Sequence, residues 1–337
     1  MNKRWLIFLA AGLLASGQAR AQLRISGYFS LDYFKGQTQS PFARGSIENL
    51  KAGLLFSGEW TSQFSYSLEI QTKENMRFEI EQAWAGFTPS EAFGVKLGLY
   101  LVPFGKYNTS GRPFQTSLAE SPYPVGEFFP SSWRDLGILA EGKIGFLSYS
   151  AYLGNGLAES ESLAAGQQFK DNNKDKGKGL RLGFFPSQNL EIGASYYTGK
   201  SDAANQRTVS LQGLDATWTA TNINLKAEYS RAFIDNPAPF SQGKAEGYFV
   251  LLWINLGSLS PVFGFEKSKY EDAFHGVGFS DPLQAGQGIF QNHSRWAFGL
   301  VYSAHENILL KLEYDLNKET ALELEDNLFR VQVAVHF

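Results

Sequence analysis

The last ten residues of the chain read LFRVQVAVHF, from Leu328 to Phe337. Apolar side chains occupy every second position from Phe329 to Phe337, and the positions between them are polar or small, beginning with Arg330. Successive side chains of a strand point to opposite faces of a sheet, so this period of two predicts a strand with one apolar face. The chain therefore ends in a β-strand whose final aromatic residue lies on the apolar face.

The same alternation recurs upstream, and it defines a series of strands. Short breaks and mostly longer breaks alternate along the chain. The longest break spans 105–134. About sixteen segments result, each near the ~9–11 residues that a tilted strand needs to cross a bilayer. The pattern slips at 213–218 and fails at 248–254, where bulges or protein contacts are expected. Clear examples of the alternation are 23–33, 50–60, 64–73, 95–101, 223–230 and 308–316.

A soluble β-sandwich or propeller would also alternate, and it is the competing architecture. The outer face of such a protein would be rich in Lys and Glu. Here the polar positions of the alternating segments carry Ser, Asn, Gly and Tyr as well as charged residues. The chain has 28 Phe, 15 Tyr and 7 Trp, and several of them lie near the ends of apolar segments, as in the aromatic girdles of membrane barrels. We therefore predict an all-β fold, a transmembrane antiparallel β-barrel of about 16 strands with short periplasmic turns and long extracellular loops.

The N-terminus has the parts of a secretory signal peptide. Two basic residues, Lys3 and Arg4, precede an apolar stretch, and an A-x-A cleavage site ends at Ala21. The apolar stretch is too short to span a membrane comfortably, which disfavours an N-terminal anchor. We expect residues 1–21 to be removed and residues 22–337 to form a single barrel domain in the outer membrane of a Gram-negative-type bacterium. The terminal alternation ending at Phe337 resembles the strand by which the outer-membrane assembly machinery recognises its barrel clients.

Composition excludes several other classes of protein. The chain has no cysteine, so it has no disulfide framework and no thiolate metal site. A formal net charge of −3 makes it a poor partner for nucleic acid. The oxygen-rich run from Asp171 to Asp175 is similar to the start of a calcium loop, but Leu182 stands where the bidentate Glu would be. We predict no cofactor, no metal site and no nucleic-acid partner.

An outer-membrane barrel enzyme, such as a lipase-like hydrolase, is the alternative function. His293 and Ser294 are the nearest approach to a base and nucleophile, yet adjacent residues of a strand point to opposite faces. We therefore predict no catalytic residue and no enzyme activity. The general-base candidates are the four histidines of the chain, His275, His293, His305 and His336.

Two stretches resemble one porin family in particular. The run GLYLVPFGKYN, from Gly98 to Asn108, looks like the strand-to-loop junction of the phosphate-selective (O/P-like) porin superfamily, and the run RDLG, from Arg134 to Gly137, is also similar to that family. The resemblance implies a homotrimeric porin in outer-membrane lipid whose third loop folds inward and narrows the pore. It further implies a selectivity for anions such as phosphate.

The loop 105–134 has the composition of a segment that packs against a wall, because it carries several aromatic residues as well as charges. Folded into a lumen, it would reduce the cross-section and place both signs of charge across the path of a solute. An external lid or a subunit contact is the alternative. The candidate constriction residues, which we expect to meet near the narrowest point, are Lys106, Arg112, Glu120, Glu127, Arg134 and Asp135.

The charged residues at the polar positions of the alternating strands are expected to line the lumen. Both signs are present, so the residues alone predict weak ion preference in a water-filled channel for the passive diffusion of small hydrophilic solutes or ions. This differs from the phosphate selectivity that the resemblance implies. The lumen-lining candidates are Arg24, Lys51, Glu69, Lys96, Glu141, Arg181, Lys226, Arg295, Lys311 and Arg330.

Overall fold

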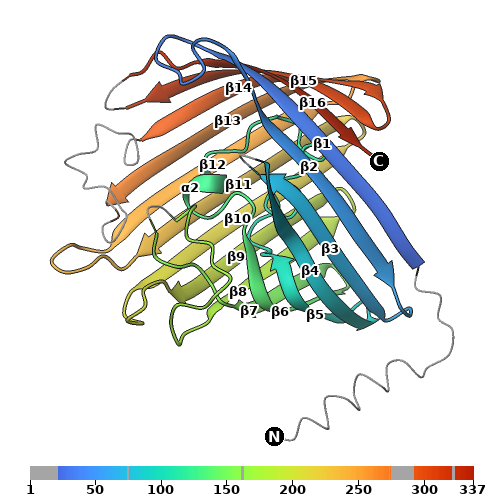
Figure 1. Ribbon diagram of the computed structural model, residues 1–337, viewed down its shortest axis with the longest axis vertical. Coiled ribbons are helices and arrows are strands. Elements are labelled where there is room, and N and C mark those ends of the chain that lie inside the picture. The colour runs from blue at the N-terminus through green and yellow to red at the C-terminus, as the bar shows by residue number, and fades with distance from the viewer. Residues whose placement is uncertain (1–21, 74–75, 161–162, 273, 275–291, 321–322) are drawn as a thin grey trace, which may run out of the picture.

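The computed structural model describes residues 22–73, 76–160, 163–272, 274, 292–320 and 323–337. Sixteen antiparallel strands close into one barrel, in which each strand pairs with its neighbours in the chain and the first strand pairs with the last (Figure 1). The predicted fold class and strand number are therefore confirmed. The expected signal peptide and His275 lie outside the described residues. No helix among the described residues has the length and apolar character of a membrane span.

All strands except one have 9 to 15 residues, the length that a tilted strand needs to cross a bilayer, and the exception, between residues 147 and 154, has 8. A single short helical turn, α2 (Pro124–Glu127), lies between β5 and β6 in the described part of the chain. The strands are β1 (Gln22–Gly36), β2 (Ser46–Glu59), β3 (Phe64–Lys73), β4 (Arg77–Ser90), β5 (Phe93–Leu101), β6 (Arg134–Ile144), β7 (Leu147–Gly154), β8 (Gly177–Ser187), β9 (Leu190–Lys200), β10 (Thr208–Ala220), β11 (Ile223–Ile234), β12 (Gly243–Ile254), β13 (Leu259–Asp272), β14 (His293–His305), β15 (Ile308–Glu319) and β16 (Leu328–His336).

The two faces of each strand differ in polarity in the way that a membrane barrel requires. In β1, Phe29 and Leu31 are exposed on the outer surface, whereas Ser30 and Asp32 are buried on the lumen side. The apolar side chains thus point away from the barrel axis and the polar ones toward it. This is the reverse of a soluble barrel, and it leaves an apolar belt that lipid can cover.

Leu312 tests this orientation, because its exposed side chain points outward near the middle of β15. Leu312→Arg should lower the free energy of unfolding by ~2–4 kcal/mol, the cost of an arginine on the lipid face at the bilayer midplane. Leu312→Met keeps an apolar side chain and should cost less than about 1.5 kcal/mol. Urea unfolding of lipid-refolded barrels measures both values, and equal values would place Leu312 on the lumen side.

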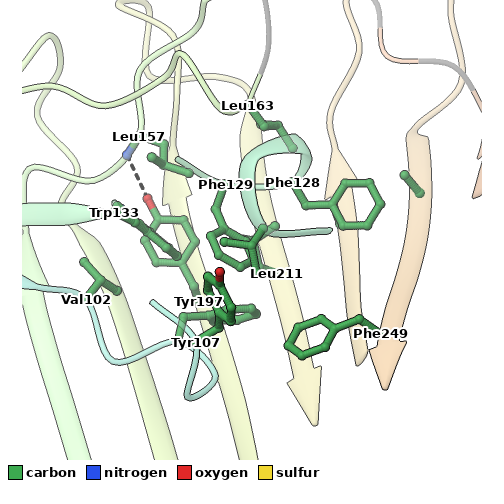
Figure 2. Close-up of a cluster of buried hydrophobic side chains, with 14 of the residues drawn as sticks. Val102, Tyr107, Phe128, Phe129, Trp133, Leu157, Leu163, Tyr197, Leu211 and Phe249 are labelled. Carbon is green, nitrogen blue, oxygen red and sulfur yellow. Dashed lines mark hydrogen bonds between the residues drawn. The ribbon is translucent and has the colours of Figure 1, made fainter. Parts of the chain in front are cut away.

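Two strands carry apolar residues on both faces. Val209 and Leu211 of β10 and Phe249 of β12 are buried on the lumen side. Figure 2 shows Leu211 and Phe249 close to aromatic side chains of the segment between β5 and β6, which covers this part of the wall. Of the bulge or protein contact expected at 213–218, the bulge is absent, since β10 pairs without interruption with β9 and β11, and the contact is present, since a Cβ at Gly213 would lie 3.0 Å from the ring of Phe104. The expected protein contact at 248–254 is present, and its partner is this chain's own loop.

Candidate functional site

The segment 102–133, hereafter the inward loop, turns into the lumen at Gly105. The φ of Gly105 is 64°, a value that other residues rarely adopt, and a Cβ there would lie 2.3 Å from Glu228 Oε2. The backbone N–H groups of Lys106 and Tyr107 donate to Glu228 Oε1 at 2.8 and 2.6 Å. Because Glu228 belongs to β11, the chain that leaves β5 reaches the wall across the barrel within a few residues.

The underside of the inward loop is an aromatic cluster pressed against this wall. Phe104, Phe129 and Trp133 are buried, and their ring centroids lie 5.2 to 5.9 Å apart. Trp133 meets the ring of Tyr197 of β9 edge-on at 4.8 Å (Figure 2). Tyr107 meets Phe249 at 5.9 Å. Aromatic pairs add about 0.5–1.5 kcal/mol each beyond the burial of their area, so this cluster holds the loop inside the barrel.

Carboxylates of the wall accept further backbone N–H groups of the inward loop. Ala119 donates to Glu313 Oε2 at 2.6 Å, and Tyr123 donates to Glu266. Buried backbone donors that lack a partner are costly, and an irregular loop in a lumen has no neighbouring strand to supply one. These acidic residues of the lumen therefore stabilise the inward loop by accepting its backbone hydrogen bonds.

A basic residue of the wall, Lys311 of β15, also holds the inward loop. Its ammonium group donates to Pro113 O at 2.6 Å, Thr116 Oγ1 at 2.9 Å and Leu118 O at 3.2 Å, and the side chain is buried. Lys311 does lie on the lumen side of the barrel, but the loop covers it. It is a clamp for the loop and does not line either of the two cavities described below.

The constriction charges do not meet one another, and that part of the prediction is wrong. The four candidates on the loop instead contact polar side chains of the barrel wall, which offers partners along the path of the loop. Arg112 makes two hydrogen bonds to Glu69, at 2.9 and 2.5 Å, and Lys106 lies 2.6 Å from Glu191. The remaining loop pairs are Glu120 with Arg330 and Glu127 with His293.

The pairing keeps the loop carboxylate Glu120 ionised. Burial by itself raises the pKa of Glu120, but the positive charges of Arg330, Arg295 and Lys51 outweigh the burial and hold the pKa below its usual range. A negative charge therefore stands on the inward loop opposite basic residues of the wall. The result is a field directed across the lumen.

Arg134 and Asp135 belong to the barrel wall, and their assignment to the constriction is wrong. β6 begins at Arg134, so both residues lie beyond the end of the inward loop. Arg134 is buried in ion pairs with Glu79 and Glu81 of β4. Asp135 is buried and accepts the backbone N–H groups of residues 136, 155 and 156 at 2.8 to 2.9 Å. Its charge stabilises the turn after β7 and does not reach a solute.

Two cavities remain beside the inward loop. The larger, of about 1330 Å³, is bounded by β1–β5, β14, β16 and the loop, and the smaller, of about 420 Å³, by β4–β8 and the loop. Leu101, Thr109 and Arg112 line both cavities. The larger cavity extends toward the long loops and the smaller toward the short turns. The two cavities are therefore adjacent at Arg112, in the part of the barrel that the inward loop does not fill.

The lumen-lining candidates fall into three groups. The first group lines the larger cavity and comprises Lys51, Glu69, Arg295 and Arg330. The second group lines the smaller cavity and comprises Lys96, Glu141 and Arg181. The third group lines neither cavity and comprises Arg24, exposed near the start of β1, Lys226, which donates to Ser110 Oγ at 3.1 Å, and the clamp residue Lys311.

Asn108 is a functional residue that the sequence analysis missed. Its side-chain nitrogen donates to Val102 O and Trp133 O at 2.8 and 2.7 Å, and its side-chain oxygen accepts the N–H of Trp133 at 2.8 Å. Asn108 thereby ties together the two ends of the inward loop. These hydrogen bonds join residues up to 25 positions apart, so no local sequence pattern predicts them.

Two of the described histidines, His293 and His336, contact the inward loop. His293 Nε2 lies 2.6 Å from Glu127 Oε1, and its ring meets Tyr123 edge-on at 4.4 Å. Ser294 follows on the same strand and so points to the opposite face. His336 stacks on Phe114 at 4.8 Å. These contacts attach the inward loop to the wall.

The fold is similar to those of several outer-membrane proteins of known structure. OmpF of Salmonella typhi, in complex with daunomycin, has 13% identity and a TM-score of 0.67 over 95% of this chain and 99% of that one. The anion-selective porin of Comamonas acidovorans has 10% identity and a TM-score of 0.67 over 94% and 100%. The trimer form of OmpT of Vibrio cholerae has 10% identity and a TM-score of 0.67 over 94% and 99%. At these identities the likeness concerns the fold alone.

The sequence itself matches a protein family and one relative. The model of the family described as Gram-negative porin matches residues 8–322. An uncharacterised protein of Aquifex aeolicus is 27% identical over 340 residues, which cover 88% of this chain and 76% of the relative. The match extends over nearly all of the barrel, inward loop included.

Proposed function

Because the chain belongs to the Gram-negative porin family and forms an outer-membrane channel, we propose that small hydrophilic solutes and ions diffuse passively through it. The observation that carries this proposal is the pair of cavities that meet at Arg112, each lined by charged side chains. The inward loop then acts as the constriction, with Lys106, Arg112, Glu120 and Glu127 as the loop charges nearest to the path. The family points to a channel rather than an enzyme.

The proposal includes a homotrimer and an exported precursor. OmpT of Vibrio cholerae has the same fold and is described in a trimer form, which supports a trimer here. Residues 1–21 would direct export, and the assembly machinery would recognise the strand that ends at Phe337. Cross-linking of the protein in outer-membrane vesicles would test the trimer, and N-terminal sequencing of the mature protein would test cleavage before Gln22.

Phosphate selectivity is the finer part of the family resemblance, and the charges at the constriction do not favour it. Most loop charges are paired with the wall, so little net positive charge faces the larger cavity. We propose a weak overall ion preference. Planar-bilayer recordings in asymmetric KCl test both points, because conductance establishes a channel and the reversal potential reports its ion preference.

Charge reversal at the constriction should move that reversal potential. Arg112→Glu replaces the cation at the junction of the two cavities and leaves Glu69 without its partner, so we expect a shift toward cation preference. Glu127→Lys should shift the preference toward anions. Unchanged reversal potentials in both variants would place the inward loop outside the conducting path, whereas phosphate block of most of the KCl current would favour a phosphate-specific porin.

A further inference from the structure

Three lysines on the outer surface of the barrel form no ion pair within the part of the chain that the structure describes. They are Lys267 and Lys269 of β13 and Lys318 of β15, and all three are exposed. β13 ends at a long loop and so does β15, and the two strands lie on either side of β14 (Figure 1). The lysines therefore lie at the long-loop end, which faces the outer leaflet of the outer membrane.

The acidic residues on the outer face of β12 and β13 are engaged with other groups. Glu246 stands across from Lys269 in the pairing of β12 with β13, but it accepts the hydroxyl of Tyr229 at 2.7 Å. Glu271 lies 3.3 Å from Arg231 of β11. The charges of the three lysines are thus left for a partner outside the chain.

Two of the lysines and a serine form one row across three adjacent strands. Lys267 pairs in register with Ser294 of β14, and Ser294 pairs with Lys318. Since neighbouring strands lie about 4.8 Å apart, the lysines flank the serine at a backbone separation of about 10 Å. Lys269 lies two residues further along β13. A phosphate group above the serine can accept from its hydroxyl and from both flanking ammonium groups. We call these four residues the lysine patch.

Toward the middle of the barrel, the outer face below the lysine patch is aromatic and apolar. The next row across the same strands is Phe265, Trp296 and Leu316, and the first two rings have centroids 4.2 Å apart. In the row after that, Phe263 and Phe298 have ring centroids 5.5 Å apart. Tryptophan side chains of membrane proteins gather at the level of the lipid headgroups. Cations therefore stand above an apolar surface at the depth where headgroups meet acyl chains.

We propose that the lysine patch binds lipopolysaccharide, the phosphorylated glycolipid of the outer leaflet, through the phosphate groups of its lipid A. The charges are complementary, and basic residues at a membrane surface attract anionic headgroups. The acyl chains of the same molecule would lie against Phe265 and Trp296. A free phosphate ion would gain only the charged contacts. The site is on the outer surface, so it does not depend on which solutes pass through the lumen.

The test is a titration of the purified protein in detergent with diphosphoryl lipid A, in which native mass spectrometry counts the bound lipid. Lys267→Gln and Lys318→Gln should each raise the Kd about fivefold, as expected for the loss of one lysine beside an anionic lipid. Dephosphorylated lipid A should bind the wild type more weakly, and the two variants should not weaken it further. Inorganic phosphate should not displace the lipid.

Lys178→Gln is the matched control. Lys178 is exposed on the outer face of β8 at the same end of the barrel, and it has a carboxylate partner, Asp175, at 3.9 Å. Its loss removes the same charge outside the lysine patch and should leave the Kd for lipid A unchanged. Equal weakening by Lys178→Gln and Lys267→Gln would overturn the site, and so would equal affinity of the wild type for the two forms of lipid A.

A second subunit is the other occupant that this face can have. The chain has no cysteine, so Ser294→Cys places a single thiol in the lysine patch. Disulfide-linked dimers of this variant in outer-membrane vesicles would show that the patch faces a neighbouring subunit, and they would overturn the lipid site. Loss of affinity in the two lysine variants alone, with Ser294→Cys free of disulfide-linked dimers, supports it. Single-channel conductance should be unchanged in Lys267→Gln, which keeps this test separate from that of the channel.

Discussion

Removal of Phe337 should eliminate most of the assembled barrel from the outer membrane. The N–H of Phe337 donates to Gly27 O at 2.9 Å, and the N–H of Gly27 donates to Phe337 O at 2.8 Å, so this residue completes the seam between β1 and β16. The Phe337 ring lies so close to Gly27 that a Cβ there would be 2.5 Å from Cζ. Loss of the two hydrogen bonds alone costs about 1–3 kcal/mol. The proposed loss of recognition by the assembly machinery adds to it.

The measurement is the amount of heat-modifiable protein in outer-membrane fractions. Phe337→Tyr, which keeps the aromatic ring and the backbone bonds, should restore nearly all of it. Refolding of the truncated chain into detergent separates the two roles, because only the seam matters there. Wild-type amounts of folded barrel in cells from the truncated chain would show that Phe337 has neither role.

The barrel could be predicted from the sequence because its signal is local. Most strands alternate with a period of two, and the outward orientation of Phe29 and Leu312 follows from the parity of their positions alone. The lipid outside imposes the same requirement on every strand, so the pattern repeats sixteen times.

The inward loop was harder to predict, because its contacts join residues far apart in the chain. Lys311 and Arg330 occupy lumen-facing positions of their strands, as the other lumen charges do. Only the path of the inward loop decides that Lys311 is covered by the loop and that Arg330 pairs with Glu120. Asp135 was assigned to the constriction because it follows the loop directly in sequence. The structure gives it to β6.

One signal for the loop was present in the sequence. Leu211 and Phe249 are apolar residues on the lumen parity, where a solvent-filled channel would favour polar ones. The aromatic side chains of the inward loop occupy that place (Figure 2). Strands that are apolar on both faces therefore mark the part of a porin wall against which a loop packs, and the remaining strands mark the open path.

Lys311→Met should release the inward loop and destabilise the protein. The substitution removes a buried ammonium group and leaves the carbonyl groups of Pro113 and Leu118 and the hydroxyl of Thr116 without their donor. A buried acceptor left without a donor typically costs about 1–3 kcal/mol, so we expect a loss of at least that size in the free energy of unfolding. Single-channel conductance should rise, because the segment 113–118 no longer has its anchor on β15.

Lys267→Met is the matched control, since Lys267 is exposed on β13 and its loss should change the stability by less than about 0.5 kcal/mol. Thr116→Val removes only one of the three acceptors and should give an intermediate rise in conductance from a barrel that still folds. Channels of wild-type size from both Lys311→Met and Thr116→Val would mean that the aromatic cluster alone positions the loop. A graded rise would mean that the ammonium group of Lys311 sets how far the loop narrows the pore.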